Sequence, residues 1–171
     1  DSDETLATPS HFSKDPGNTL YWRTTPRRLD AEAIRDSMLA VSRQLDPERP
    51  EGSMLVDFEY HADIVHPERV KALKALNGNH RTIYVPTLRG HRHRLYDLFD
   101  YPDDEAVNSA RATTTVPTQA LFLMNSEMVM KHAAALAERL EQAGDADSTG
   151  KLHRLYQLCY GRVPTATEAE A

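Results

Sequence analysis

Apolar residues recur at helical spacing in the first third of the chain, after a polar start. The positions that share one helical face are Ala31, Ile34, Met38, Val41 and Leu45. Spacings of three and four residues are typical of a helix with one buried face. Thr25 is a favourable N-cap, and Pro26 suits the first helical position because its missing N–H costs nothing there. Pro47 disfavours helical geometry in the residue before it, so a helix is predicted from Pro26 to about Asp46.

The middle of the chain carries weaker signals. Residues 54–61 alternate like a strand but also fit helical spacing, so both interpretations stay open. Pro67 opens a short predicted helix, which Asn77 and Gly78 end. Residues 82–88 hold a β-branched and aromatic run that predicts a short strand, and Pro86 favours the edge of a sheet.

The last third predicts three helices. The first opens near Thr115 and Pro117, and Asn125 with Ser126 could interrupt it. Its apolar stripe consists of Leu121, Met124, Met128, His132, Ala135, Leu136 and Leu140. The second carries a stripe at Leu152, Leu155, Tyr156 and Cys159, and Gly161 is a predicted left-handed cap. The third starts at a capping box formed by Thr165 and Glu168.

Together these elements predict a mainly α fold: a helical domain with a small β element, truncated at both ends. Residues 1–25 are expected to be a tail or linker that packs through Leu20, Tyr21 and Trp22. Residues 26–171 are expected to form a single domain that is part of a larger one.

Composition narrows the function classes. Hydrophobic residues make up 40% and charged residues 27%, which is ordinary globular composition. A formal net charge of -6 disfavours generic binding to nucleic acid or to anionic membranes. No run approaches the ~18 apolar residues of a membrane-spanning helix, and no signal-peptide core is visible. Cys159 is the single cysteine, which excludes an intrachain disulfide, a covalent c-type haem and a cysteine-rich zinc site within this chain.

Carboxylates on the first predicted helix are the first candidate for catalysis. Glu32 and Asp36 lie near Arg28 and Arg35, at spacings that let both arginines reach Glu32. Such a pair could do acid/base work. The favoured interpretation is an ion-paired helix face, because charge pairs on helices are common and mostly structural.

A basic run at residues 80–94 is the candidate anion site. Its arginines are Arg81, Arg89, Arg92 and Arg94, and no acid interrupts it. Arginine forks match phosphate, sulfate and carboxylate groups. The alternative is that this run pairs with the acids that follow it, or with solvent, and that alternative is favoured.

Metal and thiol chemistry receive less support. His91 and His93 could face one ion near Asp97, and a second cluster of histidines and aspartates lies at residues 57–66. Neither spacing matches a zinc signature. Cys159 and His132 both lie on apolar stripes, so a buried structural thiol and a satisfied core or interface histidine are predicted.

Several segments in order resemble one family. They are RRLDAEAIRD at 27–36, RTIYV at 81–85, LFDYP at 98–102, TTTVPTQAL at 113–121, LMN at 123–125 and YGRVPT at 160–165, with Glu168. They resemble a planctomycete-specific domain of unknown function, found near the C-terminus of large proteins that often carry a cytochrome-c-like domain. The resemblance covers roughly Asn18 to Glu168. The family usually has a glycine-containing turn after its first helix, so residues 46–79 are expected to be an insertion.

The resemblance implies an exported parent protein, placed in the periplasm or at the cell surface, with any haem in a separate domain. It also implies an association with sugar-binding-type modules. It supplies no catalytic residue. The motif positions where a shared polar site, or a buried network that fixes the fold, is expected are Arg28, Glu32, Arg35, Asp36, Asp100, Arg111, Gln119 and Asn125.

The first hypothesis is therefore a non-catalytic module that docks other domains of a redox-linked protein, without a cofactor of its own. The alternative is a hydrolase or lyase acting on anionic polysaccharide, or a domain that binds anionic glycan. In that alternative the arginines of residues 81–94 hold the substrate, and two of Glu32, Asp36 and Asp100 transfer protons.

Overall fold

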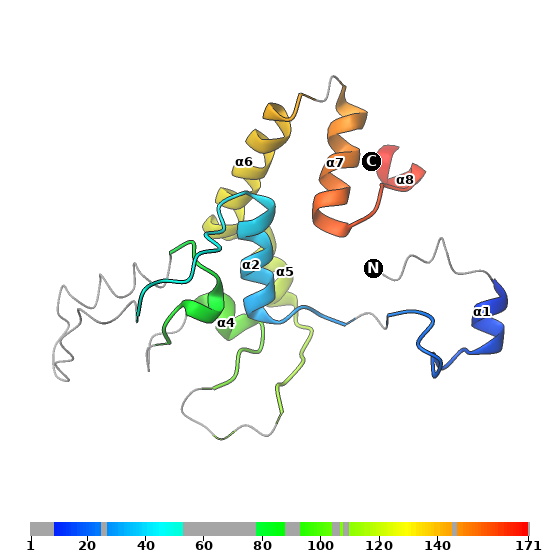
Figure 1. Cartoon of the computed structure of the whole chain (residues 1–171), viewed down its shortest axis with the longest axis horizontal. Helices are drawn as coiled ribbons and strands as arrows, with labels where there is room; N and C mark the ends of the chain where they lie inside the picture. Colours follow the sequence, from blue (N-terminus) through cyan, green and yellow to red (C-terminus); the bar gives the residue numbers. More distant parts are fainter. Residues whose placement is uncertain are drawn as a thin grey trace. The chain divides into compact units, whose positions relative to one another are not determined.

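The computed structural model describes residues 9–24, 27–52, 78–87, 93–103, 107, 110–144 and 147–170. The helical elements in these ranges are α1 (Pro9–Lys14), α2 (Ala31–Val41), η1 (Thr82–Tyr84), α4 (Arg94–Leu98), α5 (Pro117–Asn125), α6 (Glu127–Gln142), α7 (Ser148–Tyr160) and α8 (Ala166–Glu170) (Figure 1). The predicted mainly α class is confirmed. Within the same ranges, strand-like pairing is limited to an isolated parallel bridge between Asp46 and His80.

The chain divides into two compact units. Leu29–Leu136 forms one, here called the central unit, and Asp1–Arg28 with Ala137–Ala171 forms the other, called the terminal unit. The expectation of a single domain over residues 26–171 stays a prediction. Across the described parts of both units, every helix is too short or too polar to cross a bilayer.

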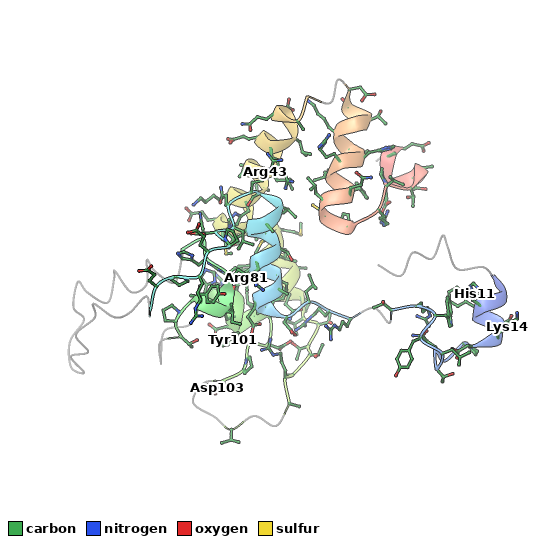
Figure 2. All side chains as sticks on the ribbon, in the orientation of Figure 1. His11, Lys14, Arg43, Arg81, Tyr101 and Asp103 are labelled. Atoms are coloured by element: carbon green, nitrogen blue, oxygen red, sulfur yellow. The ribbon has the colours of Figure 1, made fainter. Side chains whose placement is uncertain are left out.

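The core of the central unit lies where α2, α4 and α5 meet. Its buried members are Ala31, Leu95, Tyr96, Phe99 and Phe122, with partly buried Met128 and Val129 of α6 packed against them. Phe99 and Phe122 meet edge to face, with ring centroids 6.1 Å apart. Tyr101, labelled in Figure 2, stacks on Tyr96 at 4.8 Å. These contacts fix the helices that carry the polar groups described below.

The first long helix is shorter than predicted. It begins at Ala31, after Asp30 in extended geometry, and it ends at Val41. Residues 27–30 are not helical, so the predicted start at Pro26 is wrong, although Pro26 itself lies outside the described residues. At the other end the Ser42 hydroxyl donates to the Met38 carbonyl at 2.7 Å, and Arg43 adopts a positive φ of 57°. A left-handed residue cannot continue the helix, so the predicted end near Asp46 is also wrong.

The predicted strand at 82–88 is replaced by the 3-10 turn η1. The cause is Asp36, whose Oδ1 accepts from the Thr82 backbone N–H at 2.9 Å and from its hydroxyl at 2.6 Å. Those bonds hold the start of the segment against α2 instead of against a neighbouring strand. The earlier predictions for residues 54–61 and 67–76, and most of the expected insertion at 46–79, lie outside the described residues.

The predicted interruption near Asn125 and Ser126 is confirmed. Ser126 is extended, with ψ of 130°, and it separates α5 from α6. Because Ser126 interrupts the helical spacing, residues of α5 and α6 that are spaced as one helical face do not share one face, and the predicted apolar stripe is not continuous. Leu121 and Met124 are 57% and 71% exposed, whereas His132 and Leu136 further along are buried.

Residues 9–24, expected to be a tail or linker, hold α1 and a polar turn. The Asp15 carboxylate accepts from the backbone N–H groups of Thr19 at 2.9 Å and Leu20 at 2.8 Å. Trp22 donates from its indole to the Asp15 carbonyl at 3.0 Å and packs edge-on against Phe12. Leu20 and Tyr21 are exposed, so the expected packing through these two side chains is wrong. Figure 2 labels His11 and Lys14 on α1.

The C-terminal helix ends follow the sequence signals. Gly161 caps α7 with φ of 70°. Thr165 and Glu168 form the predicted capping box, because the Thr165 backbone N–H donates to the Glu168 carboxylate at 2.9 Å and Glu168 N–H donates back at 3.4 Å. Cys159 is exposed, so its predicted burial is wrong. The reason is that α7 has no buried residue, and its apolar stripe is only half covered.

The stability of the capping box is expected to depend on pH through Glu168. Arg162 donates two 2.8 Å hydrogen bonds to the Glu168 carboxylate, and these, with the Thr165 N–H, lower the pKa of Glu168 from 4.5 to about 2. The ionised carboxylate therefore stabilises the cap fully above about pH 4.5, and that contribution is lost as the pH falls through 2. We expect a carboxyl NMR titration to show this low midpoint and Arg162→Gln to raise it toward 4.5. A midpoint near 4.5 in the unchanged chain would contradict the cap.

Candidate functional site: the pocket beside Arg35

Among the described residues of the central unit, Arg35 is the most deeply buried charged group. Its side chain is 4% exposed. One guanidinium nitrogen, Nη1, donates to the His80 carbonyl at 2.9 Å and to the Thr82 hydroxyl at 3.1 Å, and Nη2 donates to the Gly78 carbonyl. Asp36 lies 3.4 Å from Nη1. Arg35 therefore supplies donors to carbonyl groups that no helix or sheet satisfies, and ties α2 to residues 78–82.

Glu32, the second candidate carboxylate, forms a two-pronged ion pair with Arg111. The distances from Arg111 Nη1 and Nη2 to the two Glu32 oxygens are 2.7 and 2.9 Å. Partial burial raises the pKa of Glu32, but the Arg111 hydrogen bonds, a backbone hydrogen bond and the positive charge of Arg111 together outweigh it, so the pKa lies below its usual value. The carboxylate is therefore ionised at neutral pH and occupied by a fixed partner.

Asp100, the third candidate, holds the turn after α4. Its φ is 57°, and its carboxylate accepts from the Thr114 backbone N–H and hydroxyl, each at 2.8 Å. Gln119 adds a second connection between these segments: it donates to the carbonyls of Leu98 and Thr114 and accepts from the Val116 N–H. This cluster fastens the segment before α5 to the end of α4.

The polar positions taken from the family resemblance thus fall into separate clusters. Arg35 and Asp36 belong to the first, Glu32 and Arg111 to the second, and Asp100 and Gln119 to the third. Asn125 donates to the carbonyl of Leu121, one turn earlier on the same helix, at 2.9 Å. Arg28 is half-buried in the terminal unit.

The basic run is only partly described. Arg81 and Arg94 are exposed, while Arg89, His91 and Arg92 lie outside the described residues. His93 is described and caps α4, because its Nδ1 accepts from the Leu95 N–H at 3.2 Å. The predicted anion site on this run, and the predicted metal pair of His91 with His93, stay predictions. Within the described ranges, no three histidine, cysteine or acidic side chains gather as metal ligands.

A pocket of about 230 Å³ lies in the central unit against Arg35. It is lined from α2, from residues 78–79, from the cap of α4 and from α6. The lining residues are Arg35, Leu39, Gly78, Asn79, His93, Glu127, Met128, Lys131 and His132. Two imidazoles, two cations and one carboxylate therefore meet in one small cavity.

Hydrogen bonds assign opposite tautomers to the two neutral imidazoles. The Ser42 hydroxyl gives its proton to a backbone carbonyl, so at 3.2 Å its oxygen accepts from His132 Nδ1–H. The free nitrogen of His132, Nε2, then carries a lone pair. His93 accepts at Nδ1 from Leu95, so its own Nε2 carries the proton. One histidine offers an acceptor and the other a donor.

Both imidazoles favour the neutral form. Desolvation lowers the pKa of His132, and the charges of Lys131 and Arg35 lower it further. Desolvation and Arg35 likewise lower the pKa of His93, against an opposing effect of Asp97. At neutral pH the charges on the pocket walls therefore come from Arg35, Lys131 and Glu127.

The sequence predicts His132 as a core or interface histidine and the structure buries it, but no sequence signal predicts the pocket. Glu127, Lys131 and His132 share one end of α6, which helical spacing could have revealed. Their meeting with Arg35 and His93 depends on how α2, α4 and α6 pack, and no local signal encodes that packing.

Comparison with known proteins gives one family and no closer relative. A family whose description reads PSD1, protein of unknown function (DUF1553), matches residues 2–171. Curated proteins and solved structures give no match to the chain.

Proposed function

We propose that this chain, which belongs to the PSD1 (DUF1553) family of proteins of unknown function, is a non-catalytic docking module of a larger exported, redox-linked protein. One observation carries the proposal: all three candidate catalytic carboxylates are already engaged in holding the fold. Asp36 binds Thr82, Glu32 binds Arg111 and Asp100 binds Thr114. A general acid or base must reach its substrate within hydrogen-bonding distance, and these oxygens are aimed at protein partners.

Exposed apolar side chains on α5 support the docking role. Leu121, Leu123 and Met124 are all exposed, although each belongs to a helix whose other face is in the core. Contiguous exposed apolar groups commonly mark interaction surfaces. The family resemblance supplies the expected partner, a cytochrome-c-like domain of the same parent protein, and the expected location in the periplasm or at the cell surface.

The proposal is tested by thermal unfolding of the chain with that haem domain, and separately with neutral and sulfated glycans. We expect stabilisation by the haem domain, because a partner at ~100 times its dissociation constant adds about 2.7 kcal/mol. Replacing Leu121 and Met124 together with Ser should abolish the shift, whereas the matched exposed pair Tyr160 and Val163, replaced with Ser, should leave it intact.

Turnover of a glycan is the result that would contradict a non-catalytic role. If the unchanged chain degrades a sulfated or neutral glycan, and Asp36→Asn or Asp100→Asn abolishes the turnover without lowering the unfolding temperature, the module is an enzyme. We expect no turnover, and we expect Asp36→Asn to cost about 1.5–3 kcal/mol of unfolding free energy, because it weakens hydrogen bonds to a charged group.

A further inference from the structure

We propose that the pocket beside Arg35 binds a small oxyanion that carries its own hydroxyl group, with hydrogen phosphate as the simplest example. Lys131 and the Nε2–H of His93 are the donors, and Nε2 of His132 is the acceptor. This assignment goes beyond the docking role and does not depend on it. The argument rests on the geometry of the cavity and on the protons of its two histidines.

Lys131 is the available cation of the pocket. It lines the cavity, it is exposed, and no hydrogen bond or ion pair joins it to another described residue. Glu127 lies one helical turn earlier on α6 and also lines the cavity, but the two side chains form no ion pair. Arg35 adds a fixed positive charge to the wall while its hydrogen bonds keep it in place. An unpaired ammonium and a fixed guanidinium on the walls of one cavity favour an anion there.

The histidine tautomers argue against a metal ion. His93 uses the lone pair of Nδ1 on the Leu95 N–H, so its Nε2 keeps a proton and cannot ligate. His132 and the Glu127 carboxylate are then the available ligands in the lining, and two cations share the cavity with them. Two ligands beside two positive charges disfavour a metal ion, and no third ligand gathers with them among the described residues, whereas an oxyanion finds positive charge and hydrogen-bond donors.

The lone pair of His132 selects among oxyanions. Its Nδ1–H is committed to Ser42, so neutral Nε2 can only accept. An anion with a hydroxyl group, such as hydrogen phosphate, can donate to it. Sulfate has no proton to donate, and it would place an oxygen lone pair against a nitrogen lone pair, which leaves a polar contact unsatisfied.

The size of the pocket fits a small ligand. A volume of about 230 Å³ corresponds to roughly eight water molecules at ~30 Å³ each. It lies below the ~300–1,000 Å³ of pockets for drug-sized molecules. One tetrahedral oxyanion with a few waters, or a compact molecule that carries one, can therefore occupy it.

The test is a titration of the 171-residue chain with sodium phosphate and with sodium sulfate at pH 7.5, at an ionic strength held constant with chloride. The imidazole NMR signals of His93 and His132 are followed. We expect saturable shifts of both signals with phosphate, and at least several-fold weaker binding of sulfate. Absence of a saturable shift with phosphate, or equal affinity for the two anions, would overturn the assignment.

Variants separate the pocket from general charge effects. Lys131→Met should weaken phosphate binding about tenfold or more, as expected for a lost charge-assisted hydrogen bond. Lys14→Met removes the same charge from α1 and should change affinity less than twofold. His93→Asn keeps a side-chain acceptor at the cap of α4 but removes the imidazole donor, so it should also weaken binding. Unchanged affinity in Lys131→Met and His93→Asn would reject the pocket, and neither result bears on docking by α5.

Discussion

Arg35→Met is expected to cost about 3–5 kcal/mol of unfolding free energy, because removing one partner of a buried polar network leaves the others unpaired. The carbonyls of Gly78 and His80 would lose their donor, and Asp36 would lose its neighbouring positive charge. Met keeps an unbranched apolar stem like that of Arg and lacks the guanidinium, so the loss reports mainly the polar contacts. Denaturant unfolding followed by circular dichroism measures the change.

Arg81→Met is the matched control for that substitution. Arg81 is exposed, it lies next to the same network, and the exchange of side chains is identical. Its expected effect is within about 0.5 kcal/mol, as for most surface substitutions. A similar loss in both variants would mean that overall charge, and not the buried network, sets the stability of the central unit.

Leu95→Ala is expected to destabilise the central unit by about 2–5 kcal/mol through lost burial and the cavity left behind. Leu95 is fully buried among α2, α4 and α5. Leu121→Ala makes the same chemical change at an exposed position of α5 and should stay within about 0.5 kcal/mol. Chemical unfolding gives the loss of unfolding free energy in each variant. Equal losses would show that Leu121 packs as a core residue in solution.

Helix ends with local chemistry could be predicted from the sequence. Gly161 and the pair of Thr165 with Glu168 carry their signals within a few residues, and the structure places caps there. The ends of α2 could not, because Ser42 and Arg43 stop the helix through a side-chain bond to Met38 and a positive φ, which no local spacing encodes.

The polar residues could be named from the sequence, but their partners could not. Helical spacing pairs Glu32 with arginines of its own helix, whereas its partner Arg111 is 79 positions away. Asp36 likewise bonds Thr82, 46 positions on. Tertiary packing determines partners so distant in sequence. The pocket depends on the same packing, so it could not be predicted from the sequence.

The bonds from Arg35 to residues 78–82 also have a kinetic meaning. Joining Arg35 to Gly78 closes a loop of 43 residues. The chain entropy lost in such a closure scales as (3/2)RT ln n, about 3.3 kcal/mol plus a constant. That entropy is spent before the guanidinium bonds form, whereas the core contacts of α4 with α5 span shorter stretches of chain. We infer that α4 and α5 pack together before Arg35 fastens residues 78–82, so the pocket walls form only after that pairing.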